Sequence, residues 1–195
     1  MINSILQADQ SFFYILNGLL GNNGFFDVII KFTSVYLVYC VPLALLISWF
    51  IYKNDRDHIA MLKATIASVF MWQVPTRIIA WLWYRPRPIV ALADTKELMF
   101  HVPSYSFPSD HSTFLMALAS YFYLLGYKKV GIWTGIIAII VGVSRVIAGL
   151  HYPGDILAGW LLGIIGAYLL FLIDKLIEKY AAKPLLAVAK FIKLA

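Results

Sequence analysis

Two short segments of the chain bring together residue types that can bind a phosphate group and cleave its ester. Residues 108–111 read Pro-Ser-Asp-His, and residues 144–155 place a Ser-Arg pair, a histidine and an aspartate at fixed intervals. Arginine and serine can hold phosphate oxygens, one histidine can attack phosphorus, and a second can protonate the leaving group. Each segment adjoins a long apolar run, and ionisable groups at membrane depth are costly enough that they usually serve a function.

The apolar content of the chain predicts that it lies in a membrane. Of its 195 residues 62% are hydrophobic and only 13% are charged, and the mean hydropathy is +0.79. A soluble core of this size could not bury so much apolar surface, so we expect an all-α integral membrane bundle that forms one domain over residues 1–195. The net charge is +6, and the basic residues cluster in short loops and the C-terminal tail. This distribution suits an anionic membrane surface better than nucleic acid as a partner.

Five apolar runs are predicted to cross the bilayer as helices, and they cover about 33–52, 59–84, 110–125, 130–149 and 155–173. Residues 11–20 are too few to span, so they predict an interfacial N-terminal helix. A sixth span would require residues 11–32 to cross, which Asp27 and the neighbouring glycines disfavour. Residues 174–195 are basic and amphipathic, and we expect them to lie on the membrane surface with a break at Pro184.

The distribution of lysines predicts the orientation of these spans. Lysines are concentrated in the turns at 53–58 and 127–129 and in the C-terminal tail, so these segments should face the cytoplasm. The segment 85–107 and the turn 149–154 then share the outer face. Both histidine motifs are therefore expected to meet at the outer surface of the membrane.

Three arginines near that face are candidates to bind phosphate, because the planar guanidinium group matches phosphate oxygens and stays charged. Arg85 and Arg87 end the second apolar run, where interfacial snorkelling is a simple alternative explanation. Arg145 lies near the outer end of a run of Ile, Val, Gly and Ala. That position favours a functional role for Arg145.

The start of the third span offers a second anion site. Ser109 is expected to be the N-cap of a helix that begins at Asp110. A helix N-terminus presents free N–H groups and a partial positive charge, and His111 beside it can donate a proton to a departing oxygen. An ordinary cap, with Asp110 favourable to the helix dipole, explains Ser109 and Asp110 equally well.

His151 and Asp155 are four residues apart at the start of the last span. If the helix begins near Pro153, the carboxylate can reach one imidazole nitrogen, fix the tautomer and leave the other nitrogen free to attack phosphorus. A structural His–Asp pair at a turn is the alternative. The presence of two histidine motifs and an arginine cluster on one face favours the catalytic interpretation.

These motifs resemble those of the type 2 phosphatidic acid phosphatase superfamily. Residues 144–155 match its Ser-Arg-(five)-His-(three)-Asp motif at every fixed position. Residues 108–111 are similar to its Pro-Ser-Gly-His motif, with Asp110 in place of glycine, and residues 87–88 resemble the end of its Lys-(six)-Arg-Pro motif. The Phe-Pro-Ser-Asp-His and Arg-Pro-Arg-Pro segments are similar to bacterial undecaprenyl pyrophosphate phosphatases linked to bacitracin resistance.

The chain departs from that pattern at two places. The lysine of the first motif would fall at Ala80, and Arg77 is the nearby cation that could replace it, although it is out of register. Asp110 puts an acid beside a predicted anion site, where it could cap the helix, point away or hold an arginine.

The resemblance implies a two-step hydrolysis through a phosphohistidine, with no metal and no other cofactor. His151 would attack the terminal phosphorus, Asp155 would orient His151, and His111 would protonate the leaving oxygen. The residues implied or considered as phosphate contacts are Arg87, Ser109, Arg145, Arg85, Asp110 and Arg77. Of the other histidines, His58 in an inner loop is expected to be solvated, and His101 in the outer loop is expected to have no role in the site. The outer histidines lack the close spacing and the Cys or Glu partners that favour zinc.

The implied substrate has a phosphate at the outer surface and a lipid tail in the bilayer. Undecaprenyl pyrophosphate, cleaved to the monophosphate so that the cell-wall lipid carrier is recycled at the bacterial cytoplasmic membrane, is the first choice. Phosphatidate, phosphatidylglycerophosphate and lipid A phosphate are alternatives within the class. A small membrane transporter and a non-catalytic lipid-binding scaffold are the alternatives from other classes, and the oligomeric state is left open.

Overall fold

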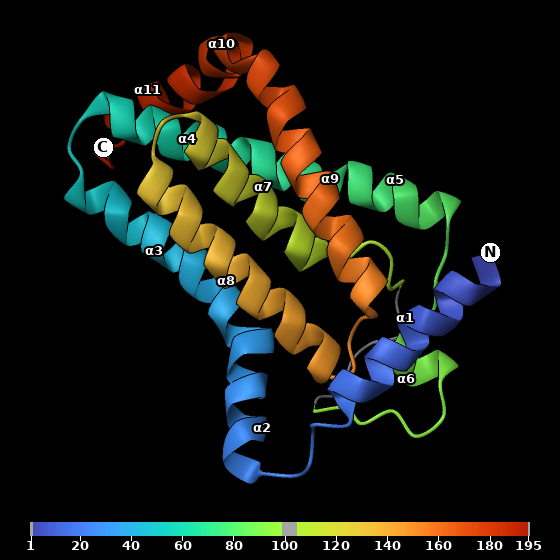
Figure 1. The fold of residues 1–195 in the computed structure, drawn as a ribbon. Coiled ribbons are helices and arrows are strands. Elements are labelled where there is room, and N and C mark those ends of the chain that lie inside the picture. Colours follow the sequence, from blue (N-terminus) through green and yellow to red (C-terminus); the bar gives the residue numbers. More distant parts are fainter. Residues whose placement is uncertain (1, 99–104, 195) are drawn as a thin grey trace.

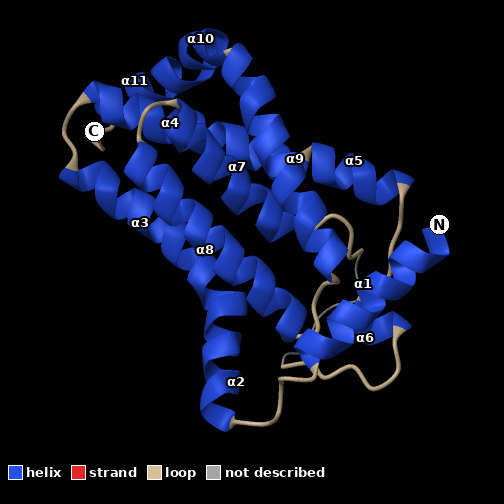
Figure 2. Cartoon of the chain, in the orientation of Figure 1, coloured by secondary structure: helices blue, strands red, loops and turns tan. Residues whose placement is uncertain are grey.

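A computed structural model describes residues 2–98 and 105–194, so His101 lies outside the described part. The described residues form helices connected by turns (Figure 2). Among them, an isolated bridge joins Pro86 and Tyr105. The expected all-α membrane bundle is confirmed. The elements in chain order are α1 (Ile2–Asn17), α2 (Gly24–Lys31), η1 (Phe32–Tyr36), α3 (Leu37–Ile51), α4 (Asp55–Gln73), α5 (Pro75–Leu82), α6 (Pro88–Ala91), α7 (Asp110–Leu124), α8 (Lys128–Ile147), α9 (Pro153–Leu172), α10 (Asp174–Ile177), η2 (Glu178–Ala182) and α11 (Lys183–Phe191).

Helix α7 forms the centre of the bundle and packs against α4, α8 and α9 (Figure 1). Its side chains Leu115, Leu118 and Tyr121 are completely buried. The start of α7, the end of α8 and the start of α9 meet at one end of the bundle, where α1 and α6 also lie. Helices α10 and α11 lie at the opposite end, so the two histidine motifs share an end that is remote from the C-terminal tail.

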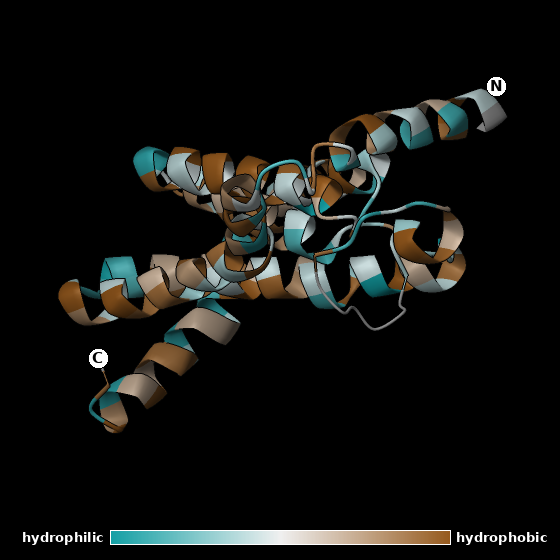
Figure 3. Cartoon of the chain, turned by 90° about the horizontal axis from the view of Figure 1, so that it is seen from below, coloured by the Kyte–Doolittle hydropathy of each residue, from teal (hydrophilic) through white to brown (hydrophobic). Residues whose placement is uncertain are grey.

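Many large hydrophobic side chains of the bundle are exposed, as in a protein that faces a bilayer. Figure 3 shows hydrophobic residues along most of its helices. Within residues 2–98 and 105–194, three helical stretches are long and apolar enough to cross a membrane: Gly24–Ile51, Lys128–Ile147 and Pro153–Leu172. Helix α4 carries charged residues in its first turns and α7 has 15 residues, although both lie within the bundle. The count of five spans therefore stays a prediction.

The second predicted span is not a single helix. Helix α4 ends at Gln73 and α5 begins at Pro75, so the run predicted over 59–84 is broken inside the bundle. Proline lacks the N–H that would continue the helical hydrogen bonds, and its ring clashes with the preceding turn. Helix α5, which carries Arg77, begins after this one-residue break.

Two π-helical turns correct other predicted boundaries. The first span extends from Gly24 to Ile51 because the turn at Phe32–Tyr36 joins α2 to α3, with the Leu37 N–H bonded to the Phe32 carbonyl. A second π turn, Glu178–Ala182, joins α10 to α11. The predicted break at Pro184 is wrong, because this proline occupies the first turn of α11, where a helix tolerates the missing N–H.

The prediction that His58 is solvated is also wrong. Its side chain is buried at the start of α4 and stacks on Trp49, with ring centroids 4.1 Å apart. Its Nε2 lies 2.9 Å from the Trp49 carbonyl oxygen. His58 therefore helps to pack α4 against α3 at the end remote from the other histidine motifs.

Candidate active site

His151 lies in the turn between α8 and α9, and its side chain is buried. Its Nδ1 lies 2.9 Å from the Ser106 carbonyl oxygen and 3.6 Å from Asp155 Oδ2. Both neighbours are acceptors, so Nδ1 carries the proton and Nε2 keeps its lone pair. Nε2 lies 3.2 Å from Arg87 Nη1, which orients the lone pair toward a cation.

Asp155 is fully buried in the first turn of α9, where its carboxylate is fixed by several donors. Oδ2 accepts the Tyr152 N–H at 2.9 Å and the Ser106 hydroxyl, and Oδ1 accepts Arg85 Nη1 at 2.7 Å. The bond to Tyr152 is the reciprocal capping arrangement expected of an acid three residues into a helix. These bonds hold the carboxylate beside His151.

The backbone around Ser106 connects the two motifs. The Ser106 N–H donates to the Arg85 carbonyl at 2.7 Å, and the Ser109 N–H donates to the Asp155 carbonyl at 3.1 Å. The segment 105–109 is thereby held between the chain before α6 and the start of α9. Ser106 was not among the residues expected from the sequence, where its only signal is that it precedes the 108–111 motif.

Arg87 and Arg145 are the two arginines whose charges act on the imidazole of His151. Arg87 is buried and donates to the Leu150 carbonyl at 2.8 Å. Arg145 is also buried, and its Nη1 donates to the Ser34 carbonyl at 2.8 Å in the π turn of the first span. Burial of its guanidinium lowers the pKa of Arg87, although nearby carboxylates oppose that effect, and arginine starts so high that it stays charged.

Two buried polar atoms next to this cluster have no hydrogen-bond partner among the described residues: Arg145 Nε and Ser109 Oγ. Ser109 is the N-cap residue of α7, as expected, but its side chain makes no capping bond. An unpaired buried polar group destabilises a fold by about 1–3 kcal/mol. The arrangement therefore suits a bound anion that accepts from both atoms.

The environment keeps the His151 imidazole neutral. Burial lowers the pKa of His151 to about 4, the charges of Arg145 and Arg87 act in the same direction, and the bond to Asp155 opposes them. A neutral imidazole with its proton on Nδ1 has a nucleophilic Nε2 at physiological pH.

His111 and Asp110 line a cavity of about 430 Å³ between α3, α4 and α7. The other lining residues are mostly apolar and include Val38, Pro42 and Phe114. Asp110 accepts a hydrogen bond from the Tyr105 hydroxyl at 3.2 Å. The cavity thus places a histidine and an acid at the polar end of an apolar groove.

Arg77 and Arg85 have different partners in the structure. Arg77 is exposed on α5, and its guanidinium carbon lies 6.0 Å from the centroid of the Tyr105 ring. Arg85 pairs with Asp155 and with Asp9 Oδ2, the latter at 2.6 Å. These carboxylate contacts differ from the phosphate contact expected for Arg85 from the sequence.

Helix α9 approaches the start of α7 closely at Gly159, next to the candidate site. A Cβ atom on Gly159 would lie 2.9 Å from the Ser109 carbonyl oxygen and 2.9 Å from Ser112 Cβ. Only glycine therefore lets α9 come this near to the start of α7.

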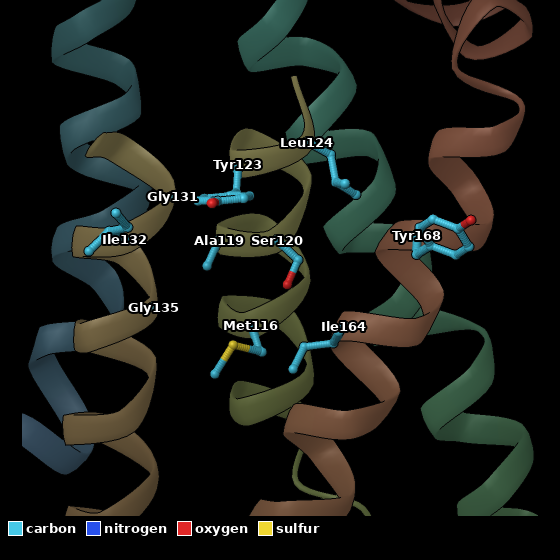
Figure 4. Close-up of a pocket in the computed structure, with 10 residues that line it drawn as sticks. All are labelled: Met116, Ala119, Ser120, Tyr123, Leu124, Gly131, Ile132, Gly135, Ile164 and Tyr168. Atoms are coloured by element: carbon cyan, nitrogen blue, oxygen red, sulfur yellow. The ribbon is translucent and has the colours of Figure 1, made fainter. Parts of the chain in front are cut away.

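A second cavity of about 430 Å³ lies between α7, α8 and α9, nearer the other end of the bundle (Figure 4). Its lining is apolar except for the Ser120 hydroxyl and two tyrosines. It carries no group suited to phosphate chemistry, so the site is the polar cluster around His151. The lining residues are Met116, Ala119, Ser120, Tyr123, Leu124, Gly131, Ile132, Gly135, Ile164 and Tyr168.

Comparison with known proteins places this cluster in a family. The chain is 31% identical over 168 residues to the undecaprenyl-diphosphatase BcrC of Bacillus subtilis, which covers 86% of this chain and 85% of that protein. It is 28% identical over 159 residues to the bacitracin transport permease protein BcrC of Bacillus licheniformis, covering 82% and 77% of the two chains.

The crystal structure of a transmembrane PAP2-type phosphatidylglycerolphosphate phosphatase from Bacillus subtilis has the same fold, with a TM-score of 0.63 over 91% of this chain and 90% of that one at 24% identity. The family model of the PAP2 superfamily matches residues 57–178, which include both histidine motifs. This chain therefore belongs to the PAP2 superfamily.

Proposed function

We propose that this protein is a membrane lipid phosphatase that hydrolyses undecaprenyl pyrophosphate to undecaprenyl phosphate at the outer face of a bacterial cytoplasmic membrane. The observation that carries the proposal is a buried His151 whose Nε2 lies 3.2 Å from Arg87 Nη1, next to two polar atoms that lack a hydrogen-bond partner, Arg145 Nε and Ser109 Oγ. A terminal phosphate would supply the missing acceptors. The named activity of the Bacillus subtilis relative supports the choice of lipid.

In the first step of the proposed reaction, the lone pair of His151 Nε2 attacks the terminal phosphorus. The bond from phosphorus to the bridging oxygen breaks, His111 gives its proton to that oxygen, and undecaprenyl phosphate leaves. Asp155 and the Ser106 carbonyl stabilise the charge that develops at Nδ1–H. Arg87 and Arg145 stabilise the non-bridging oxygens as their charge redistributes.

In the second step a water molecule attacks the phosphorus of the phosphohistidine. His111 accepts the water proton, the bond from phosphorus to Nε2 breaks, and inorganic phosphate leaves. The imidazole returns to its neutral form with the proton on Nδ1. The isoprenoid tail lies in the groove between α3, α4 and α7, which ends at His111.

The proposal is tested by phosphate release from undecaprenyl pyrophosphate in detergent with EDTA present. The purified wild type should release phosphate, and His151→Ala should reduce kcat by at least about a thousandfold because the nucleophile is absent. His58→Ala, which removes the histidine stacked on Trp49 at the other end of the bundle, is the matched control and should keep its activity once folded protein is counted.

A second arm of the experiment distinguishes the alternatives. Labelled phosphate should remain on denatured wild-type enzyme as an acid-labile adduct and be absent from His151→Ala. Release from phosphatidylglycerophosphate, phosphatidate or lipid A phosphate, but not from the pyrophosphate, would reassign the lipid. Equal release by the wild type and His151→Ala would reject the histidine mechanism.

A transport function has less support from the described residues. The polar groups around His151 and those around Lys63, which pairs with Asp174 at 2.8 Å, lie at opposite ends of the bundle. Completely buried apolar side chains of α7, such as Leu115 and Leu118, fill the space between them. A polar path across the bundle is therefore interrupted by its core.

A further inference from the structure

We propose that Asp9, on α1, is a positioning residue that acts through Arg85 on the Asp155–His151 pair. The inference rests on the proposed phosphatase function. It assigns a part in the reaction to a helix that precedes the family-matched residues 57–178.

Arg85 forms a bridge between two carboxylates. Its Nη1 donates to Asp155 Oδ1 at 2.7 Å, and its Nη2 donates to Asp9 Oδ2 at 2.6 Å. The three side chains are largely withdrawn from solvent, with 16% of Arg85, 11% of Asp9 and none of Asp155 exposed. Solvent screening of these pairs is therefore weak.

Asp9 also contacts the turn that carries the site. Its Oδ1 accepts the N–H of Gly154 at 2.7 Å, one residue before Asp155. Each oxygen of Asp9 therefore accepts a hydrogen bond from a neighbour of Asp155: one from Arg85, the other from the backbone in the first turn of α9. A side chain near the start of the sequence fixes a carboxylate that lies 146 positions later in the numbering.

Apolar contacts hold α1 in the same place. The guanidinium carbon of Arg85 lies 3.8 Å from the centroid of the Tyr152 ring. The Tyr152 ring also packs against Phe13 of α1, with centroids 5.6 Å apart and Phe13 fully buried. Arg85 is therefore enclosed by a carboxylate from α1 and an aromatic ring that α1 supports.

This geometry has a consequence for catalysis. With Asp9 present, Arg85 divides its charge between two carboxylates and stays in the orientation that satisfies Asp155 Oδ1. Without Asp9, Arg85 pairs with Asp155 alone and draws more of its negative charge away from His151. The developing imidazolium is then less stabilised, while no group that touches the substrate has been removed. The expected effect is on kcat rather than on KM.

Asp9→Asn is the appropriate variant, because it keeps the acceptor for Gly154 and removes only the charge. It should lower kcat by about tenfold, the lower end of what a charge-assisted hydrogen bond contributes, and change KM by less than about twofold. Asp27→Asn is the matched control. Asp27 accepts a bond from Gly21 N–H at the start of α2, and its loss should leave kcat unchanged.

A double-mutant cycle separates positioning from general stabilisation of the fold. If Asp9 acts through Arg85, the variant with both Asp9→Asn and Arg85→Gln should have the kcat of Arg85→Gln alone. Multiplicative losses in the double variant, an unchanged kcat in Asp9→Asn, or a change confined to KM would each overturn the proposal. Activity is expressed per folded protein, so a loss of stability alone does not imitate the expected result.

The same four proteins are compared in their affinity for orthovanadate, a mimic of the transferred phosphoryl group. The affinity is measured by isothermal titration calorimetry. Asp9→Asn should weaken vanadate binding about tenfold when Arg85 is present, and adding Asp9→Asn to Arg85→Gln should cause no further change in affinity. This readout needs no lipid, so inactivity of the wild type on undecaprenyl pyrophosphate rejects the proposed substrate alone. Vanadate affinity that is the same in the wild type and Asp9→Asn would reject the role of Asp9.

Discussion

At the scale of single residues, the tautomer of His151 is set by two acceptors of different kinds. The Ser106 carbonyl lies closer to Nδ1 than the carboxylate of Asp155 does, at 2.9 Å against 3.6 Å. A carbonyl fixes the proton without adding charge, whereas the carboxylate can follow the imidazole as it becomes positive. The resting state and the charged intermediate can thus use different partners.

The lowered pKa of His151 leads to a first prediction. Its pKa of about 4 lies below the ordinary value of 6.5, so the imidazole remains neutral as the pH falls through 6 and becomes protonated only near 4. The nuclear magnetic resonance signal of ¹³C-labelled His151 Cε1, assigned by its loss in His151→Ala, should not shift between pH 8 and pH 5. A titration midpoint near 6.5 would contradict the buried environment.

The role of His111 as proton donor leads to a second prediction. The leaving group of a pyrophosphate lipid is itself a phosphate, with a second pKa of about 6, whereas a monophosphate lipid must expel a far more basic alkoxide. His111→Ala should lower kcat by about 10²–10⁴-fold on a monophosphate lipid and by less on the pyrophosphate. Equal losses on both lipids would mean that His111 does not protonate the leaving oxygen.

At the scale of elements, interruptions of helices position the site. Pro75 separates α5 from α4, and the chain after α5 brings Arg87 to the imidazole and Arg85 to Asp155. The π turn at Phe32–Tyr36 offers the Ser34 carbonyl to Arg145. A π turn leaves backbone groups shifted from their usual partners and is often found at functional sites. The π turn therefore provides a hydrogen-bond acceptor for Arg145, and the break at Pro75 separates the helix that leads to Arg85 and Arg87 from α4.

The contact of α9 with α7 at Gly159 gives a third prediction. Gly159→Ala would put a Cβ 2.9 Å from the Ser109 carbonyl, so the start of α7 must shift, with an expected destabilisation of about 1–3 kcal/mol. Both Tm and kcat should fall, because Ser109 moves relative to His151. Gly135→Ala is the matched control, since its Cβ would make an ordinary contact of 3.8 Å with Ala119. An unchanged kcat in Gly159→Ala would show that the site tolerates the shift.

The sequence allowed the membrane class and the two motifs to be predicted, because hydropathy and the spacing of His151 and Asp155 are local. Ser106 could not be found in this way, since His151 lies 45 positions later in the sequence and the two meet only in the folded structure. Asp9 lies in a helix whose pairing with Arg85 depends on tertiary structure. Pro75 can be read from the sequence, but hydropathy alone does not distinguish one long helix from two consecutive helices.

At the scale of the whole molecule, the two ends of the bundle have different polar clusters. Lys63 is buried at the end remote from the site and pairs with Asp174 at 2.8 Å and Glu178 at 3.2 Å. Lys190 of α11 pairs with Asp55 at the same end. These pairs attach the C-terminal helices to α4, in the part of the chain where lysines are concentrated. The charge bias thus predicts that this end faces the cytoplasm.

That orientation is a fourth prediction, and labelling of single cysteines in intact cells tests it. In a Cys40→Ser background, Ala93→Cys lies just after α6, at the end of the bundle that holds the site, and Lys129→Cys lies in the first turn of α8; both positions are exposed. A membrane-impermeant maleimide should label position 93 in intact cells and position 129 only after lysis. The reverse pattern would invert the topology and place the site in the cytoplasm.

The groove that ends at His111 and Asp110 opens between α3, α4 and α7, and exposed Tyr39 lies at its side. If the lipid tail enters there, encounters between enzyme and substrate take place by lateral diffusion within a two-dimensional phase. The relevant concentration is then the mole fraction of substrate among all amphiphiles rather than its molarity in the solution. At a fixed total amount of substrate, addition of inert detergent should slow the reaction by surface dilution, whereas a water-soluble phosphate ester should be insensitive to it.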